Sequence, residues 1–176
     1  MLRVLITGMS GTGKSTLLER LAALGYKTAE TDADPSLRRF VPVEGEATRN
    51  YASNSADWAE TAGQEGEWLW NEERIQQLLS TEDAEVLFLC GTAPNQVKFY
   101  PQFDHIILLS APAQVILDRV RSRTGNPYGQ NPTEQEQIRS DLEAVEPLLR
   151  RGATLEIDTT PPIEQVLEAV LDAVIP

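Results

Sequence analysis

An octapeptide near the start of the chain, GMSGTGKS at Gly8–Ser15, leaves few folds open. It fits the pattern Gly-x4-Gly-Lys-Ser, in which successive backbone amides surround a phosphate group. The apolar run before it, Leu2–Thr7, predicts a buried strand, and the leucine-rich run after it, Lys14–Gly25, predicts a helix. Strand, glycine-rich loop and helix N-terminus together predict a phosphate-binding loop. In such a loop Lys14 reaches the β- and γ-phosphates, and the Ser15 hydroxyl ligates Mg²⁺.

Composition predicts one globular domain over residues 1–176, because 41% of the chain is hydrophobic. The single Cys90 and single His105 exclude an intrachain disulfide and a Cys/His metal cluster. A net charge of −12 argues against a nucleic-acid partner. The chain has no apolar run long enough to span a membrane and no signal-peptide pattern, so we expect a cytoplasmic protein without a membrane partner. Either a monomer or a homodimer fits the sequence.

Strand and helix patterns alternate along the chain, with little periodicity in the polar stretch between residues 45 and 66. Such alternation predicts an α/β fold: a three-layer α/β/α sandwich with a five-stranded parallel sheet. Ligands then bind beyond the carboxyl ends of the strands. Besides the first strand and helix, the predicted strands are Tyr26–Thr31, Glu85–Cys90, His105–Ser110 and Ala153–Ile157, and the predicted helices are Trp68–Ser80, Pro112–Thr124, Thr133–Arg151 and Pro161–Val174.

Missing motifs narrow the class of phosphate-binding protein. The chain has no Asn-Lys-x-Asp motif of guanine-specific GTPases and no strand ending in Asp-Glu as in motor ATPases. Over nearly its whole length it resembles the small P-loop kinases of the shikimate kinase and nucleoside monophosphate kinase group. The likeness rests on GMSGTGKST, on the turn Thr31-Asp32-Ala33-Asp34, on Gly91 after the third strand, and on the ending Ile157-Asp158-Thr159. It implies the P-loop NTPase fold, with ATP and Mg²⁺ as cofactors.

The resemblance also implies roles for the acidic turn after the second strand. In shikimate kinases, two aspartates with the spacing of Asp32 and Asp34 lie in this turn. By this likeness Asp32 helps Ser15 to hold Mg²⁺ through water, and Asp34 orients the acceptor and takes its proton. The alternative for Asp34 is that it caps a helix begun by Pro35 and Ser36. By the same likeness, Gly91, after the third strand, is expected to contact the acceptor.

Arginines are the remaining catalytic candidates. Arg119 and Arg123 are four residues apart and share a helix face, where they would stabilise charge on the transferring phosphoryl group. The alternative is a solvated surface. The segment 119–131 resembles the lid of these kinases, and the segment 34–80 resembles their acceptor side. There Arg74 would hold an acceptor phosphate. The alternative for Arg74, equally good, is a position on an exposed helix face beside Trp70. The predicted nucleotide-binding residues are Gly8, Met9, Ser10, Gly11, Thr12, Gly13, Lys14, Ser15, Thr16, Arg119, Asp158, Thr159, Thr160 and Pro161.

The sequence therefore predicts a kinase that moves the γ-phosphoryl group of Mg-ATP to a hydroxyl or phosphate of a small molecule. It departs from shikimate kinases after the third strand, where Cys90–Asn95 replaces a run of glycines, and it lacks their acceptor-binding signature. The acceptor is therefore not predicted. Two alternatives remain: an ATP-binding regulator or slow ATPase without an acceptor, and a nucleotide-binding protein that has lost catalysis.

Overall fold

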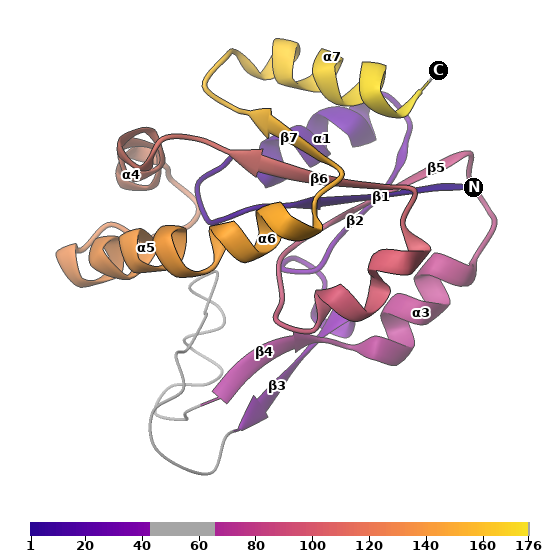
Figure 1. Ribbon diagram of the computed structural model, residues 1–176, viewed down its shortest axis with the longest axis horizontal. Helices are drawn as coiled ribbons and strands as arrows, with labels where there is room; N and C mark the ends of the chain where they lie inside the picture. The colour runs from indigo at the N-terminus through magenta and orange to yellow at the C-terminus, as the bar shows by residue number, and fades with distance from the viewer. Residues whose placement is uncertain (43–65, 176) are drawn as a thin grey trace.

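A central parallel sheet organises the computed structural model, which describes residues 1–42 and 66–175. Its strand order is β2-β5-β1-β6-β7, so β1 lies in the middle and the strands beside it come from later in the chain (Figure 1). This order creates a crevice at the carboxyl end of β1, where connections leave toward both sides of the sheet. The strands are β1 (Leu2–Thr7), β2 (Lys27–Glu30), β5 (Val86–Cys90), β6 (His105–Ser110) and β7 (Leu155–Asp158).

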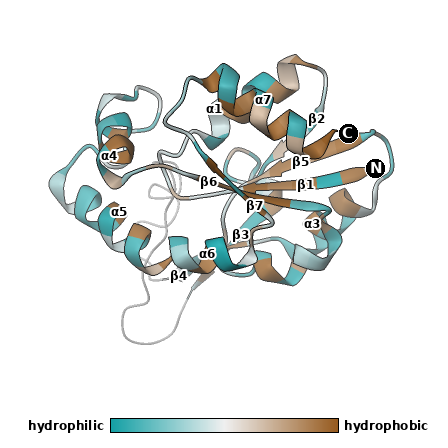
Figure 2. Ribbon diagram, turned by 45° about the horizontal axis from the view of Figure 1, so that its top comes forward, coloured by the Kyte–Doolittle hydropathy of each residue, from teal (hydrophilic) through white to brown (hydrophobic). Residues whose placement is uncertain are grey.

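Helices cover both faces of this sheet, which confirms the predicted three-layer sandwich. Helices α1 (Lys14–Ala23) and α7 (Ile163–Val174) pack on one face, while α3 (Glu72–Ser80) and the 3-10 helix η2 (Gln96–Gln102) pack on the other (Figure 1). Every residue of β5 is buried. Phe88 and Cys90 belong to the hydrophobic core under α1 and α7, and Leu87 belongs to the core under α3 and η2. Figure 2 shows the mostly brown, hydrophobic strands between helices that turn teal faces outward.

Two further helices stand at the carboxyl edge of the sheet. Helix α4 (Ala113–Ser122) and helix α5 (Pro132–Ala144) enclose a third small core, in which Tyr128 of the connecting loop packs among Val120 and Ile138. The prediction of one helix over Thr133–Arg151 is wrong. The helix is interrupted at Val145, and a separate helix α6 (Glu146–Gly152) follows. The interruption arises because Pro147 has no amide hydrogen with which to continue the helical hydrogen bonds.

A pair of antiparallel strands was not predicted. Strands β3 (Arg38–Pro42) and β4 (Gly66–Trp70) pair so that Phe40 lies opposite Trp68. The predicted helix start at Trp68 is therefore wrong, because alternating aromatic side chains favour a strand once a partner strand is present. Trp70 is 1% exposed, and the helix begins only after Asn71, whose side chain caps the amide of Arg74.

The polar stretch with little periodicity, between residues 45 and 66, lies outside the described residues except for Gly66, which begins β4. The short 3-10 helix η1 (Pro35–Leu37) leads from β2 into β3. None of the helices within residues 1–42 and 66–175 has the length and apolar character of a membrane span.

Candidate active site

The glycine-rich loop joins β1 to α1 at the crevice. Gly13, the residue before α1, has a φ of 91°, a left-handed conformation that favours glycine, and no side chain caps the amides of the first turn. Gly11 approaches α4 so closely that a Cβ there would lie 2.9 Å from Cγ1 of Val120. The loop therefore directs backbone N–H groups and the positive end of a helix at one point, which suits an anion.

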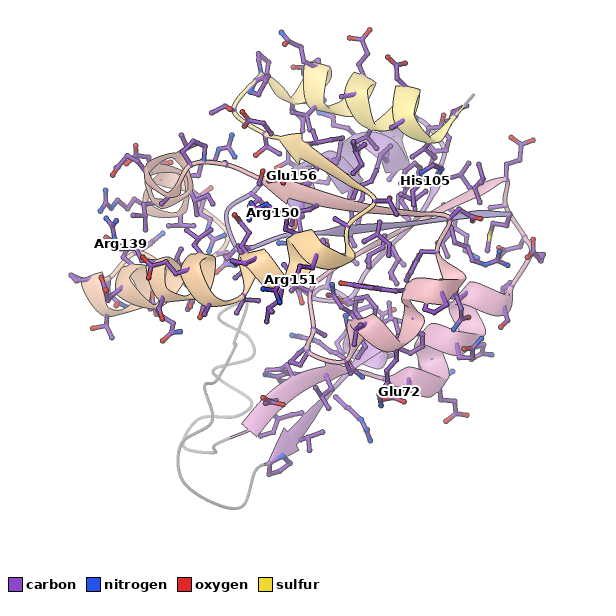
Figure 3. All side chains as sticks on the ribbon, viewed as in Figure 1. Glu72, His105, Arg139, Arg150, Arg151 and Glu156 are labelled. Atoms are coloured by element: carbon purple, nitrogen blue, oxygen red, sulfur yellow. The ribbon has the colours of Figure 1, made fainter. Side chains whose placement is uncertain are left out.

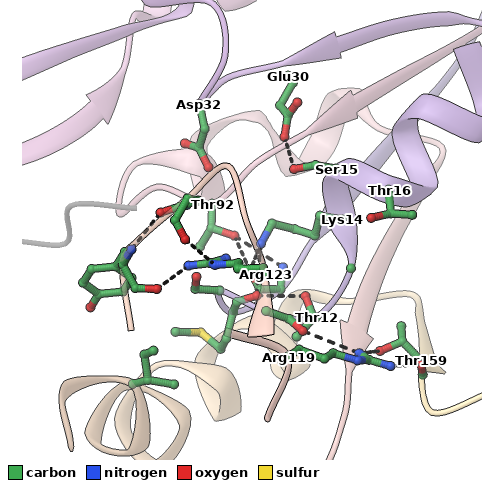
Figure 4. A pocket seen from close by; sticks show the side chains of 18 of the residues that line it. Thr12, Lys14, Ser15, Thr16, Glu30, Asp32, Thr92, Arg119, Arg123 and Thr159 are labelled. Carbon is green, nitrogen blue, oxygen red and sulfur yellow. Dashed lines mark hydrogen bonds between the residues drawn. The ribbon is translucent and has the colours of Figure 1, made fainter. Parts of the chain in front are cut away.

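Lys14 lies along this loop. Its Nζ donates hydrogen bonds to the carbonyl oxygen of Gly8 at 2.8 Å and to that of Met9 at 3.0 Å (Figure 4). The amine is thus held against the first two residues of the loop, where Lys14 lines a pocket.

A pocket of about 700 Å³ opens over the loop, a volume typical of small-molecule sites. Its walls come from the loop, from the ends of β2 and β5, from α4 and α5, and from the segment after β7. Most predicted site residues meet here. They are Gly8, Met9, Ser10, Gly11, Thr12, Gly13, Lys14, Ser15, Thr16, Asp32, Arg119, Arg123, Thr159 and Pro161.

Five predicted site residues do not line this pocket: Asp34, Arg74, Gly91, Asp158 and Thr160. The exposed Asp34 accepts a hydrogen bond from the amide of Ser36 at 2.9 Å, which is the capping alternative. The exposed Arg74 side chain donates to Gln77 on its own helix.

Gly91 and Asp158 shape the rim from outside the pocket. A Cβ on Gly91 would lie 1.9 Å from Oγ1 of Thr31, so this glycine lets β5 and the acidic turn touch. Asp158 accepts hydrogen bonds from both the amide and the hydroxyl of Thr160, and these bonds lower the pKa of its carboxyl. The Asp158 carboxylate is therefore directed at Thr160, two residues further along the chain.

Glu30 is a site residue that the sequence analysis missed. It is the last residue of β2, and its carboxylate accepts a hydrogen bond from the Ser15 hydroxyl (Figure 4). The strand was predicted to continue through Glu30 to Thr31, whereas β2 ends at Glu30 and so places its carboxylate at the ligand-binding edge of the sheet. Two oxygen groups of the kind that Mg²⁺ prefers are thus adjacent at the loop.

Arg119 connects the loop to the segment that follows β7. Its guanidinium donates to the hydroxyl and the carbonyl of Thr159, and one nitrogen lies 3.5 Å from the carbonyl of Gly11. The side chain therefore fixes the side of the pocket opposite Glu30 (Figure 4).

Arg123 holds the loop between α4 and α5. Its Nε donates to the carbonyl of Asn126 at 3.0 Å, and its Nη2 donates to that of Tyr128 at 2.6 Å. Burial lowers the pKa of this guanidinium and raises the pKa of Tyr128 to about 12. An arginine guanidinium stays charged in proteins, so both contacts are hydrogen bonds from a cation to backbone carbonyls.

His105 and Arg150 both lie away from the pocket. His105 begins β6, at the edge of the sheet opposite the pocket (Figure 3). Arg150 on α6 bridges Glu146 at 2.7 Å and Glu156 at 2.8 Å, and these carboxylates raise its pKa. In the described ranges no three His, Cys, Asp or Glu side chains cluster as a metal cage.

The fold and the loop define a P-loop phosphate-binding protein. A protein-family profile described as "AAA domain" matches residues 4–140. Shikimate kinase of Mycobacterium avium (strain 104) is 31% identical over 161 residues, which cover 89% of this chain and 84% of that relative. The chain therefore belongs to the family of this AAA domain profile. Within it, the chain belongs to the shikimate kinase-like group of small P-loop kinases.

Solved structures show the same fold at low identity. The shikimate kinase of Bacteroides thetaiotaomicron superposes with a TM-score of 0.66 and 15% identity, covering 98% of this chain and 97% of that one. A gluconokinase from Sinorhizobium meliloti 1021 gives 0.61 and 18%, covering 98% and 91%.

Proposed function

We propose that this protein is a kinase that transfers the γ-phosphoryl group of Mg-ATP to a hydroxyl or phosphate of a small molecule. The observation that carries the proposal is the uncapped N-terminus of α1 beside Lys14, opening into a pocket of about 700 Å³. Backbone amides and a lysine at a helix start fit a nucleotide polyphosphate. Phosphoryl transfer requires positioning and charge neutralisation, which this arrangement supplies.

Ser15 and Glu30 fit a magnesium ion better than a metal that needs a protein cage. Mg²⁺ takes one or two protein oxygens and completes its shell with water and substrate phosphates. When bound, it neutralises charge on the β- and γ-phosphate oxygens. We assign Ser15 as the direct protein ligand and Glu30 as the carboxylate that holds the hydroxyl and the surrounding water.

Asp32 takes the role of orienting the acceptor. It follows Glu30 by two residues and lines the pocket, whereas Asp34 caps η1 outside it. A carboxylate within reach of an acceptor hydroxyl aligns it and receives its proton as the bond to phosphorus forms. The proposal gives Asp34 and Arg74 no part in this reaction.

The two arginines divide their tasks. Arg119, bonded to Thr159, forms the wall against which the nucleoside end of ATP would lie. Arg123 keeps the loop around Asn126 and Tyr128 closed over the phosphates, which excludes water from the transfer.

The experiment measures ADP release from Mg-ATP with shikimate, gluconate, nucleosides, nucleoside monophosphates and aminoglycosides as acceptors. One acceptor class should stimulate the rate, and Lys14→Ala should lower that rate by roughly 100-fold or more. Lys98→Ala is the matched control, because Lys98 pairs with Glu72 on the surface. If the wild-type protein binds no ATP, the proposal is wrong. If it hydrolyses ATP without stimulation by any acceptor, the slow-ATPase alternative replaces the kinase.

A further inference from the structure

The Lys14 amine has three N–H groups, and the glycine-rich loop occupies two of them. Nζ donates to the carbonyl oxygens of Gly8 and Met9, so one N–H is left for a ligand in the pocket. The direction of this third N–H follows from where the two carbonyl oxygens lie. Any group that fixes these carbonyls therefore fixes the direction in which the lysine contacts a phosphate.

Threonine hydroxyls hold both carbonyl groups. The Thr12 hydroxyl donates to the Met9 carbonyl at 2.8 Å, and the Thr92 hydroxyl donates to the Gly8 carbonyl at 2.9 Å. Thr12 belongs to the loop itself, whereas Thr92 comes from the segment after β5. The Oγ1 of Thr92 also accepts from the amide of Gly8 at 3.3 Å. The Thr92 hydroxyl thus holds Gly8 by both its N–H and its C=O group.

Gln96 determines which way the Thr92 proton points. The amide of Ala93 donates to Oε1 of Gln96 at 3.0 Å, so Nε2 faces Thr7 and donates to its Oγ1 at 3.3 Å. The Thr7 hydroxyl then gives its own proton to Thr92 Oγ1 at 3.0 Å rather than to Oε1 of Gln96 at 3.5 Å. Because Thr92 Oγ1 accepts from Thr7 and from Gly8, its one proton goes to the Gly8 carbonyl. Gln96 is 2% exposed, so water does not compete for these bonds.

We propose that Thr92, oriented by Gln96, is a positioning residue for Lys14. It fixes the Gly8 carbonyl so that the third N–H of the lysine is directed at a phosphate in the pocket, which Thr92 and Lys14 both line (Figure 4). The lysine keeps both carbonyl contacts when a ligand binds, so no binding free energy is lost in rearranging the loop. The inference rests on the proposed function, because a ligand must carry a β- or γ-phosphate to use this N–H.

The test compares Thr92→Val, which removes the hydroxyl, with Thr92→Ser, which keeps it. Thr154→Val is the matched control, because Thr154 also holds one residue by both groups: it accepts from the amide of Ile106 at 2.9 Å and donates to its carbonyl at 3.1 Å. By titration calorimetry, Thr92→Val should weaken Mg-ATP binding about tenfold. Thr92→Ser and Thr154→Val should stay within about twofold of wild type. Thr92→Ala repeats the loss of the hydroxyl with a smaller side chain.

A second readout reports on the lysine without any ligand. Acylation of the Lys14 amine in the nucleotide-free protein is followed by peptide mass spectrometry. The fixed carbonyls hold the amine and slow its reaction, so Thr92→Val should speed labelling of Lys14 by about threefold or more, and Thr154→Val should not. Lys98, which pairs with Glu72 on the surface, is the internal control and should be labelled equally in all variants.

The two assays together separate positioning from other roles. Faster labelling of Lys14 combined with weaker Mg-ATP binding supports the role of Thr92. Labelling at the wild-type rate in Thr92→Val refutes it even where binding is weaker, because Thr92 would then act on the ligand directly. Binding as tight as that of Thr154→Val also refutes it, and the proposed function stands in both cases. If wild type binds no Mg-ATP, the proposed function fails and this inference fails with it.

Discussion

Replacing Arg123 by alanine should loosen the loop between α4 and α5. The change removes two hydrogen bonds from a cation, to the carbonyls of Asn126 at 3.0 Å and of Tyr128 at 2.6 Å. A hydrogen bond to a charged group contributes about 1.5–3 kcal/mol. The guanidinium is only half-buried, so water replaces part of each bond, and we expect a net loss of about 1–2 kcal/mol in the local stability of the loop.

Hydrogen exchange of the loop amides measures this loss directly. The amide of Tyr128 donates to the Asn126 side chain at 3.0 Å, and that of Gly129 donates to Glu134 at 2.7 Å. Because exchange requires local opening, Arg123→Ala should speed exchange at both amides by about 5- to 30-fold. Lysine cannot make both bonds, so Arg123→Lys should restore little of the protection.

The matched control is Arg121→Ala on the same helix. Arg121 is exposed and bonds to Gln135 and Asp118, so its removal should change exchange in the loop by less than about twofold. Equal exchange in the Arg123 and Arg121 variants would refute the inference that Arg123 holds the loop closed. The assay needs no substrate, so it is independent of the proposed function.

Three further outcomes are expected. Glu30→Gln should raise the Mg²⁺ concentration for half-maximal ADP release by about tenfold, because the Ser15 hydroxyl then loses its carboxylate partner. Asp34→Asn should leave this Mg²⁺ concentration unchanged, since asparagine can also cap η1. Asp158 has a pKa lowered from 3.8, so its carboxylate stabilises the fold above that pH and this contribution disappears as pH falls through the lowered value; urea unfolding of wild type and Asp158→Asn should therefore differ at pH 7 and converge in acid. Trp70→Ala should lower the free energy of urea unfolding by about 3–5 kcal/mol, and a loss below about 1 kcal/mol would contradict a buried strand position.

The parts of the fold that depend on neighbours in sequence were predictable. The order of strand, glycine-rich loop and helix is local, and so is the apolar run of β5, whose burial on both faces follows from its composition. The loop residues that line the pocket follow from the same local pattern. Glu30 was missed because the strand was predicted to run one residue further, to Thr31, whereas β2 ends at Glu30.

Other predictions failed where a distant partner decided the outcome. Trp68–Trp70 has the spacing of a helix start when considered alone, but pairing with β3 makes it a strand. Asp34 is a different case, because the prediction left an acceptor contact and a helix cap open; its side chain accepts a hydrogen bond from the amide of Ser36, a local contact that matches the cap.

The amino-acid sequence by itself determined that this chain forms a phosphate-binding loop between a buried strand and a helix, because that motif is built from consecutive residues. Only the tertiary structure decided which side chains meet around it. Thr92 contacts Gly8, 84 residues away in sequence, because β5, which precedes Thr92, lies beside β1. Arg119 contacts Thr159, 40 residues away, because β7, which precedes Thr159, lies beside β6. Such contacts depend on strand register and packing, which no local pattern encodes.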